Sequence, residues 1–380
     1  MTDKNTNLMC DLLKFLILLI AVDSLALPVA AQSKERKQSG FKLAVDHTVE
    51  REMKRQNIVG ISVGLISDAK IIYTQGYGFA DVGQKVKFTD ETVTNWASNS
   101  KPVVAVLAMQ LAKDNKLDLD KPISDYLEKL PEHLHPLTVR QLLSHQSGIP
   151  HYTNGKIVPA AGFKKPKDEH DPLNAMKRFI ESPLIFEPGA KESYSSYAYV
   201  LLTAVVQAAS NKPIASLIAE RITEPLSMKS FQMDVAFQNQ SNWSKPYRVV
   251  SGAPIELPDQ ANFWKHGAGG YKSNVKDFAK FANSFVKKQL LNQRSLAQMM
   301  TPQATTDGTK TQRGLGVLIH GTGKSLKMSH NGTQPEARTR MIIYPKQRHG
   351  IVVMCNCRHV DPGAITTAIY SALKTVRSRK

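Results

Sequence analysis

Apolar and polar residues alternate in a way that predicts strands near both ends of the chain. The expected strands cover residues 60–67, 70–77, 314–319, 338–344 and 350–356. Asp68-Ala69 separates the first two runs and reads as a hairpin turn. The last two runs have the short spacing of a second hairpin, which favours antiparallel pairing.

Helical periodicity dominates the region between the two groups of strands. The expected helices cover residues 42–55, 102–116, 172–181, 197–210, 213–221, 275–288, 295–300 and 364–376. The simplest arrangement of this order is an α+β fold, in which both groups of strands join one mostly antiparallel sheet. The first and last helices would cover one face, and the helical middle would be an inserted lobe against the other.

This arrangement predicts a single domain over residues 42–380. Its strands would come from about residues 60–97 and 313–357, and its helical lobe from about residues 98–310. No internal repeat interrupts this organisation. One hydrophobic core of this size is consistent with a chain of 380 residues.

The N-terminus has the pattern of an export signal. An apolar segment over residues 12–22 follows weakly charged residues, and Val29-Ala30-Ala31 offers a small-x-small cleavage pattern. We therefore expect a signal peptide over residues 1–31, a flexible polar leader over 32–41, and a secreted or periplasmic protein. The alternative is an uncleaved anchor, although Asp23 interrupts the run before it reaches the ~20 residues that a spanning helix needs. No later segment could span a membrane.

The chain is strongly basic, with a net charge of +18. Residues 1–31 carry two Lys and three Asp, which leaves +19 on the remainder. Such a charge favours anionic cell-envelope polymers as partners of an exported protein, and the alternative is simply a solvated basic surface. The basic residues are scattered and form no nucleic-acid motif, so no nucleic-acid partner is expected.

Only two cysteines follow the predicted signal, and they are Cys355 and Cys357. A disulfide between residues two apart on a strand would be strained, so two reduced thiols are expected. Two cysteines alone also make a poor metal site. The sequence therefore predicts neither a cofactor nor a structural metal.

The candidate chemistry begins at Ser98-Asn99-Ser100-Lys101. The pattern S-x-x-K occurs six times, but only Ser98 stands at a loop-to-helix junction and opens the most apolar helix after the signal. Residues three apart share a helix face, so Lys101 can take the proton of Ser98 if desolvation lowers its pKa. The backbone N–H groups of a helix N-terminus can also stabilise an oxyanion.

Five segments, in this order, carry a resemblance to a known family. They are Ala97-Ser98-Asn99-Ser100-Lys101-Pro102, residues 137–150 (LTVRQLLSHQSGIP), residues 187–197 (EPGAKESYSSY), Ala268-Gly269-Gly270-Tyr271 and His330-Asn331-Gly332-Thr333. Together they resemble the superfamily of class C β-lactamases and penicillin-binding proteins, which includes D-Ala-D-Ala peptidases and esterases. The resemblance covers about residues 42–376 and implies the DD-peptidase/β-lactamase-like fold.

The resemblance implies three catalytic residues. Ser98 would be the acylated nucleophile, Lys101 its general base, and Tyr194 the second-motif tyrosine that moves a proton between nucleophile and leaving group. The alternative for Tyr194 is a core aromatic of the helical lobe, beside Tyr197 and Tyr199. His145 also belongs to a family signature, where a structural role is expected.

The resemblance also implies an oxyanion and substrate-binding set that departs from the family pattern. The set is Ser196, His330, Gly332 and Thr333, with the backbone N–H groups of Ser98 and Thr333 as the oxyanion hole. Ser196 stands where an Asn is usual, His330 where a Lys is usual, and Asn331 where a Thr is usual. A hydroxyl makes fewer hydrogen bonds than an amide, and His is only partly charged near neutrality.

Arg338 and Arg340 flank the third motif and are candidates to replace the lost positive charge. Their alternative reading is that of solvated strand residues. Without a fixed charge at His330, efficient β-lactam hydrolysis is disfavoured, and the peptidase and esterase branches are favoured.

The sequence thus predicts an exported serine hydrolase that cleaves an amide or ester through an acyl-Ser98 intermediate. D-Ala-D-Ala carboxypeptidase-like action on cell-wall peptides is the first hypothesis. A carboxylesterase or weak β-lactamase of the same fold is an alternative. A non-catalytic cell-wall-binding homologue is another, although degenerate members usually lose Ser98, Lys101 or Tyr194 and this chain keeps all three.

Overall fold

The computed structural model describes residues 29–164, 170–233, 242–258, 260, 262–335 and 337–378. The apolar segment of the predicted signal lies outside these ranges, so its cleavage stays a prediction. Contacts divide the chain into two compact units, residues 1–48 with 372–380, and Val49–Ser371. The single domain over residues 42–380 stays a prediction. Across the described ranges, no helix is long and apolar enough to cross a membrane.

Helix α2 spans Val29–Gln56 and begins earlier than the sequence pattern suggests. The expected flexible leader over residues 32–41 is helical instead. Its residues are mostly good helix formers, such as Ala, Gln, Lys, Glu and Arg, and they continue without a Pro into the predicted amphipathic helix. Polarity alone therefore did not identify a flexible segment.

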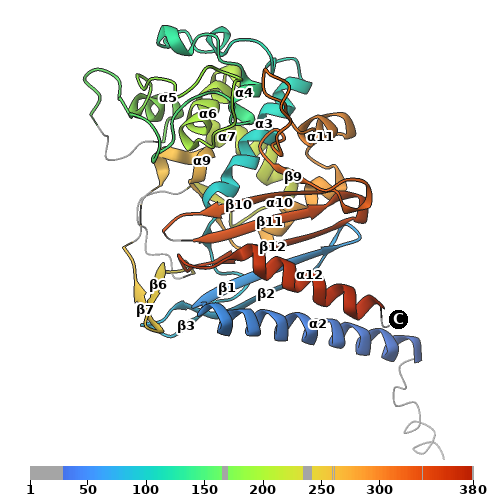
Figure 1. Cartoon of the computed structure of the whole chain (residues 1–380). Helices are drawn as coiled ribbons and strands as arrows, with labels where there is room; N and C mark the ends of the chain where they lie inside the picture. Colours follow the sequence, from blue (N-terminus) through green and yellow to red (C-terminus); the bar gives the residue numbers. More distant parts are fainter. Residues whose placement is uncertain are drawn as a thin grey trace, which may run out of the picture. The chain divides into compact units, whose positions relative to one another are not determined.

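The second unit is built on a seven-stranded antiparallel sheet (Figure 1). Its order is β3-β2-β1-β12-β11-β10-β9. The strands are β1 (Gly60–Ser67), β2 (Lys70–Asp81), β3 (Val86–Lys87), β9 (Leu318–His320), β10 (Lys327–Thr333), β11 (Arg338–Tyr344) and β12 (His349–Cys355). Strand β1 pairs with β12, with Ile61 opposite Cys355, so the first and last groups of strands join as predicted.

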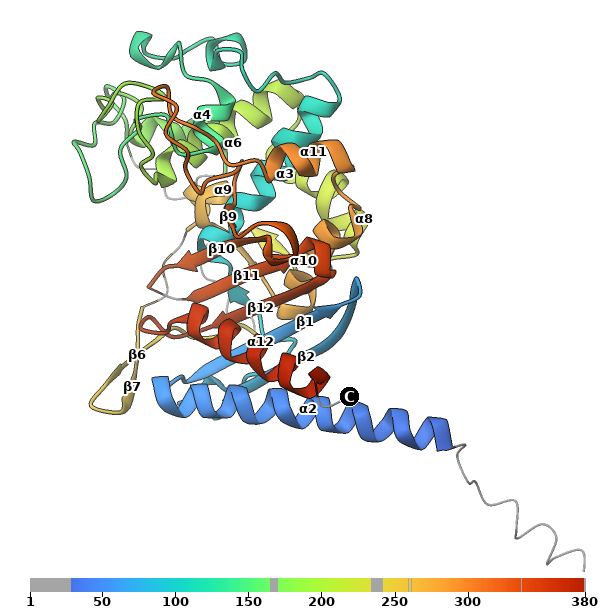
Figure 2. The same cartoon turned by 45° about the vertical axis from the view of Figure 1, so that its right-hand side comes forward.

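Helices lie on both faces of this sheet (Figures 1 and 2). Helix α10 (Val275–Lys287) packs against β1, β2, β11 and β12, with Val275 and Ala279 over Gly64. On the other face, α12 (Pro362–Ser378) stacks Tyr370 on Tyr344 of β11, with ring centroids 4.6 Å apart. The sequence placed α10 in the inserted lobe, but its wide apolar face covers the sheet.

The middle of the chain is mainly helical, as predicted. Its helices are α3 (Lys101–Lys113), α4 (Val139–Leu143), α5 (Pro172–Ala175), α6 (Ser196–Ser210), α7 (Ile214–Ile218), α8 (Glu224–Leu226), α9 (His266–Gly269) and α11 (Gln293–Met299). The predicted lobe also holds strands β5 (Gln232–Met233), β6 (Tyr247–Val250), β7 (Ala253–Glu256) and β8 (Tyr271–Ser273). Such short strands carry too little periodicity for the sequence to reveal them, and β8 pairs with β4 (Thr94–Asn95) and β5.

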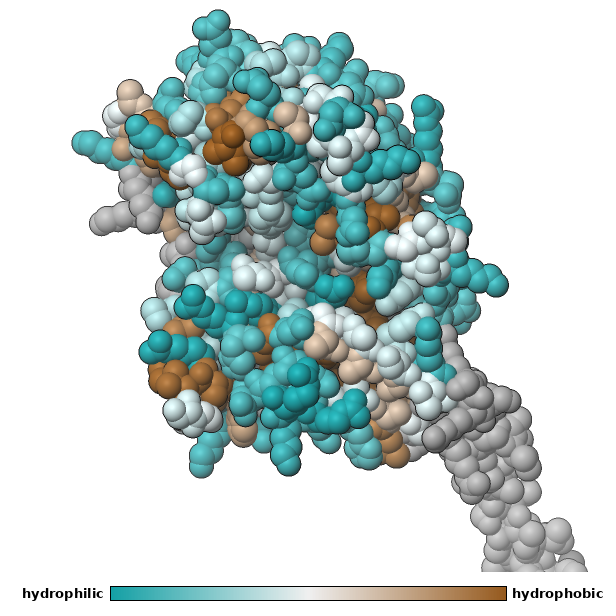
Figure 3. All heavy atoms as spheres, viewed as in Figure 1, coloured by the Kyte–Doolittle hydropathy of each residue, from teal (hydrophilic) through white to brown (hydrophobic). Residues whose placement is uncertain are grey.

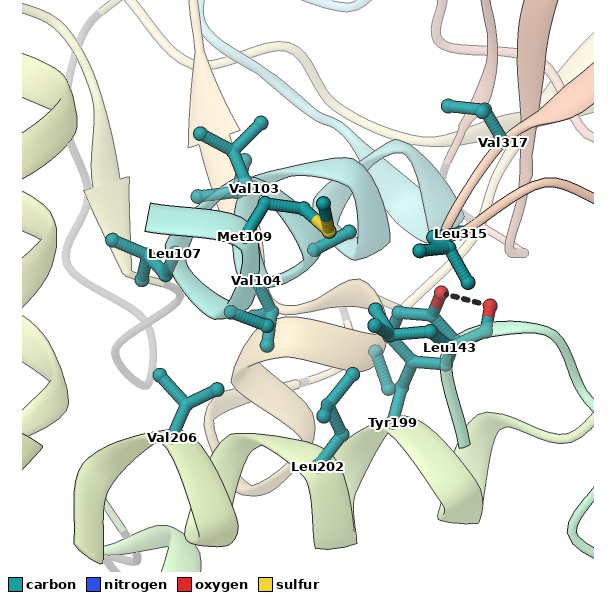
Figure 4. Packing of buried hydrophobic residues seen from close by; sticks show 14 of the residues in the cluster. Val103, Val104, Leu107, Met109, Leu143, Tyr199, Leu202, Val206, Leu315 and Val317 are labelled. Atoms are coloured by element: carbon teal, nitrogen blue, oxygen red, sulfur yellow. Dashed lines mark hydrogen bonds between the residues drawn. The ribbon is translucent and has the colours of Figure 1, made fainter. Parts of the chain in front are cut away.

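Helices α3 and α6 pack against each other and form the core beneath the candidate site (Figure 4). Val104 and Leu107 of α3 and Leu202 and Val206 of α6 are fully buried or nearly so. The Tyr199 hydroxyl donates to the Leu143 carbonyl at 2.8 Å, which ties α6 to the end of α4. This packing fixes the start of α3 relative to the start of α6.

Strands β6 and β7 pair with each other in a two-stranded sheet and form a hairpin with exposed aliphatic side chains, and Tyr247 of β6 also forms a β-bridge with Cys357. Val250 is 46% exposed and Ile255 39% exposed. Figure 3 shows a hydrophobic patch at the position of this hairpin, one of several on that face. The aliphatic residues elsewhere in the sheets are mostly buried.

We predict that Leu202→Ala lowers the free energy of unfolding by about 2–5 kcal/mol, because it opens a cavity between α3 and α6. Urea unfolding followed by tryptophan fluorescence measures the change. Leu43→Ala is the matched control, since Leu43 is also helical but is 52% exposed. Equal effects of the two substitutions would contradict the packing described above.

Candidate active site

Ser98 stands on a tight turn that leads into α3. The 3-10 turn Ala97–Ser100 precedes the helix, and Ala97 has a φ of +48°, which is unusual for a residue with a side chain. The Asn95 side-chain oxygen accepts from the Ala97 N–H at 2.5 Å, and Trp96 Nε1 donates to Ser273 Oγ at 2.7 Å. These buried contacts hold Ser98 at the edge of a cleft of about 600 Å³.

Lys101 lies directly beneath Ser98 and is fully buried. Its Nζ is 3.2 Å from Ser98 Oγ, 3.1 Å from Ser196 Oγ and 2.6 Å from the Ala268 carbonyl of α9. Burial, and then the positive charge of Arg313, hold the pKa of Lys101 well below its ordinary value of 10.5. The amine is therefore disposed to be neutral and to accept a proton.

Tyr194 also contacts Ser98. Its hydroxyl donates to Ser98 Oγ at 2.7 Å, and burial raises its pKa to about 12. His145 holds the backbone around it, because the Ser193 N–H donates to the His145 carbonyl and the Ser195 N–H to His145 Nδ1. The His145 ring also packs against Tyr194, with centroids 4.4 Å apart.

Ser196 begins α6 and points its hydroxyl toward the base. The helix is capped by the preceding residue, since Ser195 Oγ accepts from the Ala198 N–H at 3.0 Å. Ser196 Oγ does not cap the helix and accepts a hydrogen bond from Lys101 Nζ. Where the family has an amide that reaches substrate, this hydroxyl thus contacts the candidate base.

The third motif lies on β10, and the strand brings His330 and Thr333 to the same cleft. His330 is buried, and its Nδ1 contacts the Asn331 carbonyl at 2.9 Å. Burial, Lys101 and Arg313 lower the pKa of His330 to about 3, so the ring is uncharged at neutral pH. A Cβ at Gly332 would clash with Thr339 Oγ1 and the Trp96 carbonyl, so a glycine lets β10 lie close to the turn that carries Ser98.

Arg313 is one of the cleft residues that the sequence analysis missed. It lines the cleft, lies 5.9 Å from the centre of the Tyr194 ring, and pairs with Glu192 at 2.9 Å. Arg338 and Arg340, the sequence candidates for this charge, do not line the cleft. They donate instead to the Gln334 carbonyl and to Asn331 Oδ1. Arg313 stands in no motif, so nothing in the sequence distinguished it.

The structure brings the predicted site residues together. Those that line the cleft are Ser98, Tyr194, Ser196, His330 and Thr333, with Lys101 beneath them and Gly332 in the strand between. A larger cavity of about 1270 Å³ lies elsewhere in the helical lobe and contains none of them. Among the described residues, no three His, Cys, Asp or Glu side chains are grouped as a metal site requires.

This arrangement is suited to proton transfer at a serine hydroxyl. An amine with a lowered pKa and a phenol both lie within hydrogen-bond distance of Ser98 Oγ, and the side chain of Arg313 lines the same cleft. The amine can accept the proton that leaves the hydroxyl as a carbonyl is attacked. The same groups can return it to a leaving atom.

Comparison by sequence agrees with this geometry. The family model "Beta-lactamase" matches residues 45–374. The chain is 23% identical over 321 residues to Protein flp of Staphylococcus aureus strain MW2, covering 82% of this chain and 62% of that protein. It is 24% identical over 426 residues to the human serine beta-lactamase-like protein LACTB, mitochondrial, covering 84% and 77%. The chain thus spans less than two thirds of the length of Protein flp.

Solved structures share the fold at low sequence identity. EstCE1, a hydrolase with promiscuous acyltransferase activity, matches with a TM-score of 0.74 at 19% identity, covering 88% of this chain and 98% of that one. The D-amino acid amidase from Ochrobactrum anthropi SV3 matches at 0.73 and 21%, covering 89% and 99%. The penicillin-binding protein homologue from Pyrococcus abyssi matches at 0.70 and 23%, covering 86% and 75%. Since the family model covers most of the chain, the protein belongs to the β-lactamase family of serine hydrolases.

Proposed function

We propose that the protein is an exported serine hydrolase that forms an acyl-enzyme at Ser98 and acts as a D-Ala-D-Ala carboxypeptidase on cell-wall peptides. The observation that carries this proposal is the fully buried amine of Lys101, which lies 3.2 Å from Ser98 Oγ. The Tyr194 hydroxyl, 2.7 Å from the same oxygen, completes the set. Each group has the protonation state that its step requires.

Acylation begins with the neutral amine of Lys101, which takes the proton of Ser98 as Oγ attacks the substrate carbonyl carbon. The negative charge that develops on the carbonyl oxygen falls to the backbone N–H groups of Ser98 and Thr333. Tyr194 donates its proton to the leaving nitrogen and is reprotonated from Lys101. The C–N bond breaks, the C-terminal residue departs, and the acyl group stays on Ser98.

Deacylation uses the same groups in the opposite direction. A water molecule attacks the ester carbon and gives its proton to the amine of Lys101. The bond between the acyl carbon and Ser98 Oγ then breaks, and Ser98 Oγ regains a proton from the same pair of groups. The low pKa of Lys101 and the pKa of Tyr194, raised to about 12, suit a base and an acid that exchange one proton. No metal or cofactor enters the scheme.

Arg313 supports a substrate with a free carboxylate. Guanidinium and carboxylate form strong, charge-assisted hydrogen bonds, and a carboxypeptidase substrate presents a C-terminal carboxylate at the leaving group. Arg313 lines the cleft, where it also pairs with Glu192, while His330 is uncharged at neutral pH. Arg313, in the segment before β9, thus offers the positive charge that the third motif lacks with His330 in place of a Lys.

A carboxylesterase or weak β-lactamase of the same fold is the second candidate. The uncharged His330 favours the carboxylesterase of these two, because the third motif then offers no fixed positive charge to an anionic substrate. A non-catalytic cell-wall-binding homologue is the remaining alternative, and the hydrogen-bonded set of Ser98, Lys101 and Tyr194 argues against it.

Export and contact with anionic envelope polymers complete the proposal. The apolar N-terminal segment and the net charge of +18 support them. A peptidase that works on a cell wall would meet anionic polymers there. The basic surface would then raise the local concentration of the enzyme near its substrate.

Acylation of Ser98 is tested by the intact mass of the protein after mixing with benzylpenicillin and, separately, with 4-nitrophenyl pentanoate. We expect a covalent adduct in the wild type and none in Ser98→Ala, which keeps the fold and lacks the nucleophile. Reaction with penicillin supports the peptidase or slow lactamase, and reaction with the ester alone supports the esterase. Absence of any adduct or turnover, with a D-Ala-D-Ala peptide as well, would sink the proposal in favour of a binding protein.

The pH dependence of acylation reports the pKa of Lys101. Only the neutral amine accepts a proton, so the rate is full above this pKa and falls as the pH drops through it. Because the pKa is held well below 10.5, the rising limb of the acylation rate for 4-nitrophenyl pentanoate should be centred well below that value. Stopped-flow release of 4-nitrophenol measures it. A limb centred near 10.5, or one retained by Lys101→Met, is the contrary result.

Arg313→Gln should raise KM for a D-Ala-D-Ala-terminated peptide ~10-fold, because a charge-assisted hydrogen bond is lost, and spare the neutral ester. Loss of its charge should also move the rising limb of the pH profile to higher pH, since Arg313 lowers the pKa of Lys101. Arg348→Gln is the matched control, because Arg348 pairs with Asp68 and lies outside the cleft. If both variants behave alike, Arg313 is not the carboxylate partner.

A further inference from the structure

His151 lines the cleft but belongs to none of the catalytic motifs. Its Nδ1 accepts a hydrogen bond from the backbone N–H of Ser196 at 3.2 Å. An N–H donor needs a lone pair, so Nδ1 carries no proton, and the proton of the neutral ring is on Nε2. The backbone of the second motif therefore fixes the tautomer of His151.

The ring is uncharged and held in place. Burial, followed by the positive charges of Lys101 and Lys265, lowers the pKa of His151 to about 4. Tyr152 packs on the ring at 4.3 Å between centroids, and Tyr194 meets it edge-on at 5.4 Å. The Nε2–H group is thus a neutral donor of fixed orientation, and among the described residues no acceptor is bonded to it.

The position of His151 assigns it to one end of the cleft. Arg313 forms a β-bridge with Leu318 of β9 and an ion pair with Glu192. His151 instead packs on Tyr152, whose ring contacts Tyr197 and Trp264. Arg313 and His151 therefore line different parts of the cleft wall. If the leaving-group carboxylate binds at Arg313, the acyl part of the substrate extends toward His151.

We infer that His151 Nε2–H donates a hydrogen bond to a carbonyl oxygen of the acyl part of the substrate. The cleft therefore selects acyl groups that carry an amide, such as N-acylated amino acids and peptides, over hydrocarbon acyl groups. Ser196 Oγ also lines the cleft but accepts from Lys101 Nζ, so His151 Nε2–H is a separate donor from another part of the cleft wall. The inference rests on the proposed function, since it requires an acyl group on Ser98, and it deepens that function by naming the acyl class.

Two activated esters of equal length test the inference on the full chain. They are the 4-nitrophenyl esters of N-acetylglycine, which has an amide, and of pentanoic acid, which has methylene groups in its place. The variants are His151→Phe, which keeps a flat ring without a donor, and His151→Gln, whose side-chain amide can donate from the position of Nε2. Both variants lose the acceptor for the Ser196 N–H, so that effect cancels in the comparison.

The quantity to compare is kcat/KM for the amide ester divided by kcat/KM for the hydrocarbon ester. We expect His151→Phe to lower this ratio ~3- to 10-fold, the effect of one neutral hydrogen bond, and His151→Gln to retain most of it. A ratio unchanged in His151→Phe, with both esters turned over, overturns the inference and leaves the proposed function standing. If the wild type is no faster than Ser98→Ala on either ester, the proposed function itself fails.

Discussion

The buried amine of Lys101 is the constraint on which the candidate site depends. An ammonium group removed from water is strongly disfavoured, so the side chain is stable there only if it is neutral or closely bonded. Its oxygen neighbours come from Ser98, Ser196 and Ala268, and among the described residues no carboxylate contributes to the shift of its pKa. A cationic Arg313 nearby strengthens the same preference. The fold therefore lowers the pKa of Lys101 by burying its amine away from water and near the positive charge of Arg313.

Three separate parts of the fold meet at this amine. The turn before α3 supplies Ser98 and the first residue of α3 is Lys101, the segment that enters α6 supplies Tyr194 and Ser196, and β10 supplies His330. The core between α3 and α6 sets the distance between these two helices. The absence of a side chain at Gly332 sets the distance between β10 and the turn that carries Ser98. Catalytic geometry thus follows from ordinary packing between a helical lobe and a sheet.

Two histidines hold the second motif by its backbone. His145 Nδ1 accepts from the Ser195 N–H and His151 Nδ1 from the Ser196 N–H, so consecutive amides at the start of α6 are each paired with an imidazole. Such amides would otherwise lack partners at a helix N-terminus. Both pKa values are lowered, which keeps both rings able to accept. The two histidines differ in exposure and therefore in role. His145 is buried and supports the backbone, whereas His151 lines the cleft.

The sequence by itself determined the fold class, the strands β1 and β11 to the residue, the helix α3, and the family with its motif positions. These features are written in local patterns of apolar residues or in short runs of specific residues. Strand β10 has no such pattern, because Lys327–Thr333 is mostly polar and is a strand through its pairing with β9 and β11. Tertiary structure alone likewise decided three other features. These are the position of α10 over the sheet, the contact of Ser196 with Lys101, and the position of Arg313 in the cleft. Each depends on contacts between residues distant in sequence, and local patterns carry no information about which distant segments meet.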